Sequence, residues 1–207
     1  MLKKDFWEKK HADSIGRYNR VTDFARFCYY NFMKEKSGKV LDLCCGKGAD
    51  SIFFHNKGYD VTGVDYSNEA IKQFNDTQKY YKIFLSSIVH NIAEKLPFES
   101  ESYDFVYVRL GLHYFTDKEL KNIISDIKRV LKSGGLLMFQ VKSTSDKAYG
   151  IGKEIEKDMY KEKSGYLRHF FSKEYTESLL EDFNIILIEE RKIPQGSAYL
   201  EVIAEKN

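Results

Sequence analysis

Short apolar runs alternate along the chain with longer stretches in which apolar and polar residues are mixed. Residues 40–43, 59–64, 83–89, 103–109 and 136–141 are apolar and short enough for buried strands. Helices are expected over residues 49–57, from Ser67 onward, from Thr116 to Leu131 and after Ser172, since a hydroxyl residue opens three of them as an N-cap. This alternation of strand and helix favours an α/β fold with a largely parallel sheet.

The chain ends in a different pattern. Two strand-like runs, Ile185 to Ile193 and Ala198 to Ala204, are separated only by residues 194–197. A connection this short joins antiparallel strands, so a C-terminal hairpin is predicted.

Two segments fall outside the alternation. Residues 5–36 are predicted to be helical and rich in aromatic side chains, and most of these are expected to pack on the sheet. Residues 143–171 are polar, punctuated by glycine and too long for a simple crossover, which favours an inserted element.

The first strand–helix junction carries the main chemical signal. The strand at 40–43 breaks into a turn with Gly46 and Gly48, and the next strand ends in Asp65. Glycine tolerates positive φ and lets a ligand approach the backbone. A carboxylate at the carboxyl end of the second strand is placed to accept hydrogen bonds from ribose hydroxyls. Together these features are half of a nucleotide-binding βαβ unit.

Four stretches in a fixed order add a family resemblance. They are 40–48, 63–67, 96–106 and 129–137, read as VLDLCCGKG, GVDYS, LPFESESYDFV and RVLKSGGLL. From about Val40 to its C-terminus the chain resembles the class I S-adenosylmethionine-dependent methyltransferases. The resemblance implies a doubly wound, Rossmann-like, seven-stranded, mostly parallel sheet with an antiparallel C-terminal hairpin. It also implies one domain over residues 1–207, with a helical lid at 1–36 and a lid or substrate element at 143–171.

The resemblance also implies a cofactor site for S-adenosylmethionine. The first motif would hold the methionine part, Asp65 the ribose, and the corner after the third strand the adenine. The residues implied in cofactor binding are Asp42, Cys44, Gly46, Gly48, Asp65, Tyr66, Asn91, Ile92 and Arg109. Three positions depart from the family pattern: Cys44 replaces a glycine, Asn91 an aspartate and Ser133 a proline. Cys is small and Asn keeps a carbonyl acceptor, so binding is still expected.

Several of these roles have a structural alternative. The Tyr66 ring would pack on the adenine or simply cover the end of the sheet. His90 is interpreted as a partly exposed loop histidine without a role. Arg109 would bind the cofactor carboxylate or an anionic substrate, since a buried arginine needs a partner.

The acceptor side is expected around the loop 109–115, which follows the fourth strand. His113 is the candidate catalytic base, because its ordinary pKa lies near neutrality, and the alternative is a histidine satisfied by the backbone beside Tyr114. Further candidate substrate contacts are Tyr18, His113, Tyr114, Arg168 and His169. The stretch 165–171 is either a pocket wall favouring an anionic or aromatic molecule or a packed connection.

Composition narrows the partners. A net charge of +2 with interspersed charges indicates no general nucleic-acid or membrane surface. Three cysteines, two of them adjacent, suit neither a disulfide framework nor zinc, so a reduced cytoplasmic chain without a metal is expected, as a monomer or homodimer. The sequence predicts methyl transfer to O, N or S of a small molecule. Two alternatives are a non-catalytic module that binds the cofactor and a nicotinamide-dependent oxidoreductase, which Ser51 in place of a third Gly or Ala disfavours.

Overall fold

The computed structural model describes residues 4–14, 20–163 and 165–207. In chain order the elements are α1 (Lys4–Ala12), α2 (Asp23–Cys28), η1 (Tyr29–Met33), β1 (Lys39–Leu43), α3 (Ala49–Asn56), β2 (Asp60–Asp65), α4 (Asn68–Tyr81), β3 (Ser86–Val89), β4 (Tyr103–Arg109), η2 (Leu112–Tyr114), α5 (Asp117–Val130), β5 (Leu131–Lys142), β6 (Lys153–Glu156), β7 (Met159–Lys161), β8 (Leu167–His169), α6 (Lys173–Leu179), β9 (Phe183–Lys192) and β10 (Ala198–Lys206).

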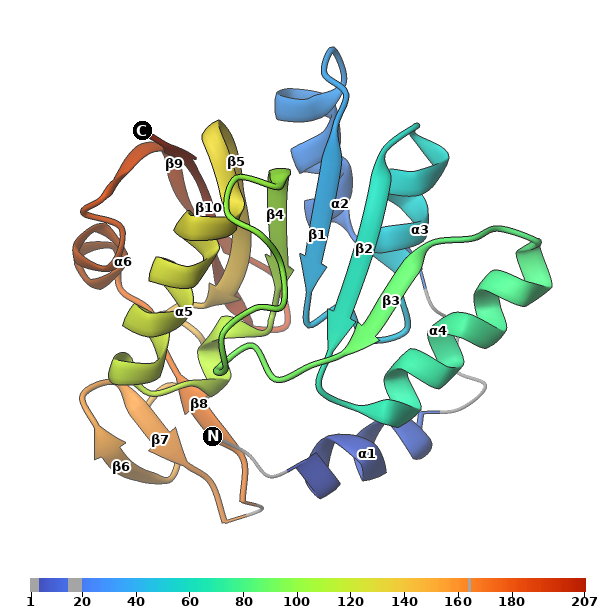
Figure 1. Ribbon diagram of the computed structural model, residues 1–207. Coiled ribbons are helices and arrows are strands. Elements are labelled where there is room, and N and C mark those ends of the chain that lie inside the picture. The colour runs from blue at the N-terminus through green and yellow to red at the C-terminus, as the bar shows by residue number, and fades with distance from the viewer. Residues whose placement is uncertain (1–3, 15–19, 164) are drawn as a thin grey trace.

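Seven strands form the central sheet in the order β3-β2-β1-β4-β5-β10-β9 (Figure 1). Strands β1 to β5 pair in parallel, whereas β10 runs antiparallel to both of its neighbours, β5 and β9. The predicted doubly wound sheet with an antiparallel C-terminal hairpin is therefore confirmed.

Alternating side chains of each strand supply two cores, one on each face of the sheet. On β4, Val106 and Val108 join the core covered by α5 and α6, while Phe105 and Tyr107 join the core covered by α2 and α3. Because β4 is buried on both faces, neither of its two sets of alternating side chains faces water, which explains the continuous apolar run in its sequence.

The helix predicted over residues 5–36 is wrong in its middle. Helix α1 ends at Ala12, and the next helix begins only after Thr22. The buried Asp50 carboxylate accepts hydrogen bonds from the Thr22 backbone N–H and hydroxyl, both 2.8 Å, and from the Tyr107 hydroxyl at 2.9 Å. Thr22 is thereby held in extended conformation, where its own hydroxyl oxygen caps α2. Satisfying a buried carboxylate outweighs helix propensity here.

The starts of β3 and β5 differ most from the expected strand boundaries. Strand β3 begins at Ser86 rather than Ile83, because the Gln78 backbone and side-chain carbonyls accept the N–H groups of Ile83 and Leu85. Strand β5 begins at Leu131, five residues before the predicted start, and its register with β4 shifts once between Tyr103 and Phe105.

Residues 143–171 contain a second sheet of three antiparallel strands in the order β6-β7-β8. A bridge between Ser143 and Phe171 closes the base of this segment. In Figure 1 this small sheet and α1 lie at the end of the molecule towards which the arrowheads of β1 and β2 point. The carboxyl ends of the parallel strands are therefore covered by two segments far apart in sequence.

Candidate functional site

The glycine turn after β1 adopts left-handed backbone at three positions, with φ of 60° at Cys44, 56° at Gly46 and 76° at Gly48. A Cβ at Gly46 would meet only the His11 ring at 3.6 Å, so the backbone there faces open space. A Cβ at Gly48 would lie 2.2 Å from the Phe74 ring of α4. Gly46 therefore leaves room for a ligand, whereas Gly48 leaves room for a helix.

Asp65 at the end of β2 is held by backbone donors. Its carboxylate accepts from the Gly46 N–H at 2.8 Å and from the Ser67 N–H at 2.9 Å. Burial raises the pKa of Asp65, while these N–H groups and the nearby His11 oppose the rise. A carboxylate fixed in this way keeps acceptor capacity for hydroxyl donors, because each oxygen has two lone pairs.

The corner after β3 is shaped by its own side chains. The Asn91 amide oxygen accepts from the Ala93 N–H at 3.1 Å, and its NH₂ group donates to Glu94 at 3.3 Å. This turn brings Asn91, Ile92 and His90 to the same cavity as Asp65. The His90 Nε2 is buried and has no hydrogen-bond partner among the described residues.

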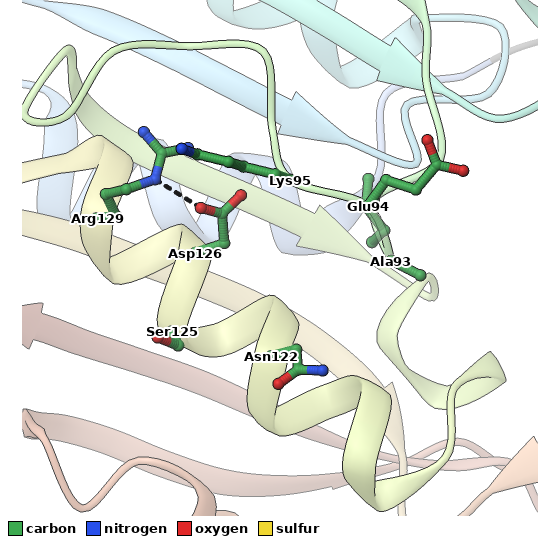
Figure 2. Close-up of a pocket in the computed structure, with 8 residues that line it drawn as sticks. Ala93, Glu94, Lys95, Asn122, Ser125, Asp126 and Arg129 are labelled. Carbon is green, nitrogen blue, oxygen red and sulfur yellow. Dashed lines mark hydrogen bonds and ion pairs between the residues drawn. The ribbon is translucent and has the colours of Figure 1, made fainter.

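A polar clamp fixes the loop that leads away from this corner. The Arg129 guanidinium donates to Asp126 at 2.6 Å and to the carbonyls of Phe98 and Leu96 at 2.7 and 3.0 Å. Asp126 also accepts the Leu96 N–H at 2.6 Å. Figure 2 shows the ion pair on α5 facing Ala93, Glu94 and Lys95 of the loop across a shallow pocket. The Leu-Pro-Phe stretch at 96–98 is thus tied to the helix that follows β4.

Helix α1 covers one side of the cavity with three residues, Trp7, Lys10 and His11. Its Glu8 carboxylate accepts from the Ser67 hydroxyl and from the N–H groups of Asn68 and Glu69, at 2.8 to 2.9 Å. Those groups open α4, where the helix dipole favours an anion. Helix α1 buries none of its residues fully, so this contact is a main attachment.

The loop between β4 and α5 forms the opposite wall. Arg109, Leu110, Gly111, Tyr114 and Phe115 line the cavity. The Tyr114 ring meets the Trp7 ring edge-on, with centroids 4.7 Å apart, so the loop and α1 touch across the cavity. The Thr116–Glu119 capping box predicted from sequence fixes the exit of this loop.

His113 lies behind this wall and not on it. It is 2% exposed, its ring packs 4.2 Å from that of Tyr114, and its Nδ1 has no partner among the described residues. Burial, together with Arg168, Lys142, Lys10 and Arg109, lowers the pKa of His113 well below its ordinary value. A neutral imidazole is therefore expected at physiological pH.

The remaining candidates divide between the cavity and its surroundings. Asp42 is buried beneath the turn, where the Ser51 hydroxyl donates to it, and burial raises its pKa well above the ordinary value. Arg168 pairs with Glu162 at 3.2 Å, and His169 lies near the Phe115 carbonyl at 3.3 Å. Tyr18 lies outside the described residues.

The cavity has a volume of about 290 Å³. Eight of the predicted site residues line it: Cys44, Gly46, Asp65, Tyr66, Asn91, Ile92, Arg109 and Tyr114. Lys10, His11 and His90 also line the cavity, but the sequence did not predict them as site residues. The first two follow Trp7 by three and four residues, the spacing of one helix face, and that spacing was a usable signal.

The residues present fit a nucleoside-containing sulfonium cofactor. A fixed carboxylate, an open glycine backbone and the Asn91–Ile92 corner converge on one cavity. Two buried nitrogens of lining residues, His90 Nε2 and Arg109 Nε, lack partners among the described residues, so a bound molecule could accept from the Arg109 Nε–H and hydrogen-bond His90 Nε2. The described residues contain no group of side chains able to hold a metal ion.

Comparison with known proteins finds methyltransferases. A family model described as a methyltransferase domain matches residues 40–135. An uncharacterized methyltransferase of Synechocystis is 39% identical over 100 residues, covering 47% of this chain and 44% of that protein. Demethylmenaquinone methyltransferase of Listeria welshimeri is 30% identical over 141 residues, covering 62% of this chain and 58% of that protein. The chain thus spans about half the length of these relatives.

Among solved structures, a methyltransferase from Methanosarcina mazei, described as S-adenosylmethionine-dependent, superposes with a TM-score of 0.76. It is 24% identical and the match covers 91% of this chain and 99% of that one. None of the helices described here has the length and apolar character needed to cross a bilayer.

Proposed function

We propose that this chain, which belongs to the class I S-adenosylmethionine-dependent methyltransferases, transfers a methyl group to an O, N or S atom of a small molecule. The observation that carries the proposal is the Asp65 carboxylate, fixed by Gly46 and Ser67 at the edge of a cavity that α1 covers. A small acceptor is supported by the name of the Listeria relative, which refers to a small molecule.

Each wall of the cavity has a role in holding the cofactor. Asp65 would accept the ribose hydroxyls, and the Asn91 side chain with the Ile92 N–H would meet the adenine, with Tyr66 beside it. The open backbone at Gly46, next to Cys44, would pass under the methionine part. Asp42 and Gly48 would act from beneath, by supporting the turn and the packing of α4.

When bound, S-adenosylmethionine supplies an activated methyl group on a sulfonium, so the protein has to align the acceptor and exclude water. Trp7 and Tyr114 touch across the cavity and would exclude water from the acceptor side. His113 does not line the cavity, so it would act as a positioning residue through the Tyr114 ring. The segments 1–36 and 143–171 would bound the acceptor chamber.

The test is calorimetric titration with S-adenosylhomocysteine, S-adenosylmethionine and NAD. We expect binding of the two sulfur nucleosides, and about 100-fold weaker binding in Asp65→Asn, because the new NH₂ group faces the N–H donors of Gly46 and Ser67. Asp60→Asn, at the exposed other end of β2, is the matched control and should bind as the wild type does.

Binding of NAD alone would contradict the proposal. Binding of the sulfur nucleosides, without release of S-adenosylhomocysteine in the presence of any acceptor of a broad small-molecule panel, would favour the non-catalytic alternative. A labelled methyl donor follows the transfer directly.

A further inference from the structure

The cavity described above has an unbalanced charge. Of the described residues that line it, Lys10 and Arg109 are the full cations and Asp65 is the acid. Burial lowers the pKa of His11, which lines the cavity, and that of His113 behind the wall. Both histidines are therefore expected to be neutral near pH 7, and they leave the positive excess unchanged. A site with excess positive charge attracts anions.

Neither cation forms an ion pair within the part of the chain that the structure describes, although the charge of Arg109 opposes the rise in the pKa of the buried Asp42. The Arg109 side chain makes no hydrogen bond or ion pair to another described residue, and its Nε is buried. The Lys10 ammonium lies over three rings, 4.6 Å from Trp7, 5.3 Å from Tyr166 and 5.7 Å from Tyr114, with no acid in contact. The Lys10 side chain is exposed and that of Arg109 is half-buried. The half-buried Lys142, by contrast with Arg109, pairs with Asp146 at 2.6 Å.

The proposed cofactor does not correct this imbalance. S-adenosylmethionine carries a sulfonium, an ammonium and one carboxylate, and so adds one net positive charge. Its carboxylate would satisfy one of the two cations at most. The second cation remains for another ligand, in the region where Lys10 faces Trp7 and Tyr114.

The walls beside Lys10 are flat and apolar. The Trp7 and Tyr114 rings meet edge-on, and the Phe6 ring meets Tyr166 in the same way at 4.8 Å. Another planar ring can pack favourably against aromatic rings such as these, either stacked or edge-on. Charge and shape therefore indicate the same class of molecule.

We infer that the methyl acceptor is a small planar organic anion, held by Lys10 against the Trp7 and Tyr114 rings. This inference rests on the proposed function. The anionic atom attacks the methyl carbon, the carbon–sulfur bond breaks and its electron pair stays on sulfur. One anion and one sulfonium become a neutral methylated product and a neutral thioether centre, and no proton is removed. The reaction therefore needs no base at the cavity wall, in accord with His113 lying behind it.

The test uses three probes of nearly equal shape, benzoate, benzamide and benzamidinium, titrated into the protein saturated with S-adenosylhomocysteine. Benzoate should bind about tenfold more tightly than benzamide, and benzamidinium should not bind. In Lys10→Met the preference for benzoate should fall to about threefold or less while benzamide is unchanged. Lys9→Met, the neighbouring exposed lysine that does not line the cavity, is the matched control and should retain the preference.

Three results would overturn the inference: equal binding of benzoate and benzamide, equal effects of the two lysine variants, or no benzoate binding at millimolar concentration. Each of these leaves the proposed function standing if S-adenosylhomocysteine binds. Failure of S-adenosylhomocysteine to bind would instead remove the proposed function and the inference with it.

Discussion

The two sides of the cavity are built in different ways. On the side that we propose holds the cofactor, the polar contacts are made mostly by backbone groups: Asp65 is held by two N–H groups, and the Asn91 side chain accepts the N–H of Ala93 in the same turn. On the acceptor side, the contacts are between side chains of α1, the η2 loop and the 143–171 segment, such as Trp7 with Tyr114 and Phe6 with Tyr166. A site built from backbone groups can be predicted largely from nearby sequence. A site built from side chains of separate segments depends on which segments the fold brings together.

The largest expected effect concerns the clamp that supports the cofactor side. Arg129→Met leaves the Leu96 and Phe98 carbonyls without the guanidinium donor, and leaves Asp126 with only the Leu96 N–H. It should lower the free energy of unfolding by about 2–4 kcal/mol, because these groups are partly buried. Urea denaturation followed by circular dichroism measures the loss.

Lys128→Met is the matched control on the same helix, since the Lys128 ammonium meets Asp182 at 3.6 Å near the surface. It should change stability by less than about 1 kcal/mol. Equal losses in the two variants would show that the loop at 96–98 is held by its own backbone, and the clamp would then be incidental.

A smaller effect is expected where the two sides meet. A Cβ at Gly111 would lie 2.6 Å from the Cys44 sulfur, although φ of −107° at Gly111 suits alanine. Gly111→Ala should therefore cost about 1–3 kcal/mol of stability through crowding. In a Cys44→Gly background most of that cost should disappear, leaving the weaker contact with Val108 at 3.2 Å.

A double-mutant cycle from thermal or urea unfolding measures this coupling. Additive losses would mean that the sulfur moves aside without cost. Coupling would show that a residue in the cofactor turn limits the side chain allowed in the acceptor loop, so the two sides would not be independent.

The cofactor side was predictable because its signals are local. Asp65 accepts the Ser67 N–H two positions away and Ser67 caps the Ala70 N–H three positions away, whereas the Gly46 N–H that Asp65 also accepts is 19 positions away. The predicted mostly parallel sheet with an antiparallel C-terminal hairpin is confirmed for the same reason, since strand and helix alternate along the sequence. Gly48 is an exception, since its neighbour Phe74 lies 26 positions away in sequence.

The acceptor side was less predictable because its contacts join distant residues. Nothing near Lys10 in the sequence indicates that its ammonium lies over Tyr114 and Tyr166. The break after α1 likewise depends on Asp50, 28 positions beyond Thr22. His113 was a reasonable candidate base by residue type, but exposure to the cavity is a property of packing that sequence spacing does not give.

The smallest expected effect concerns the attachment of α1. Glu8→Gln keeps the shape of the side chain but removes the charge that faces the N–H groups of Asn68 and Glu69. The loss should weaken S-adenosylhomocysteine binding about two- to fivefold, the size expected for an exposed anion at a helix N-terminus. Trp7 is the single tryptophan of the chain, so its fluorescence reports the docking of α1 against Tyr114. Asp5→Asn, in the first turn of α1, removes a charge that makes no such contact and is the matched control.

The same attachment should depend on pH. Burial tends to raise the pKa of Glu8, but the N–H groups of Glu69 and Asn68, the Ser67 hydroxyl and Lys4 lower it below the ordinary value. A carboxyl with a lowered folded-state pKa contributes its stabilisation above the ordinary carboxyl range and loses it as pH falls through the lowered pKa. The Trp7 signal of the wild type should therefore be constant near neutrality and change in acid, whereas Glu8→Gln should lack that transition. If both proteins show the same acid transition, the transition belongs to another carboxylate. The aromatic contacts, and not Glu8, would then hold α1 in place.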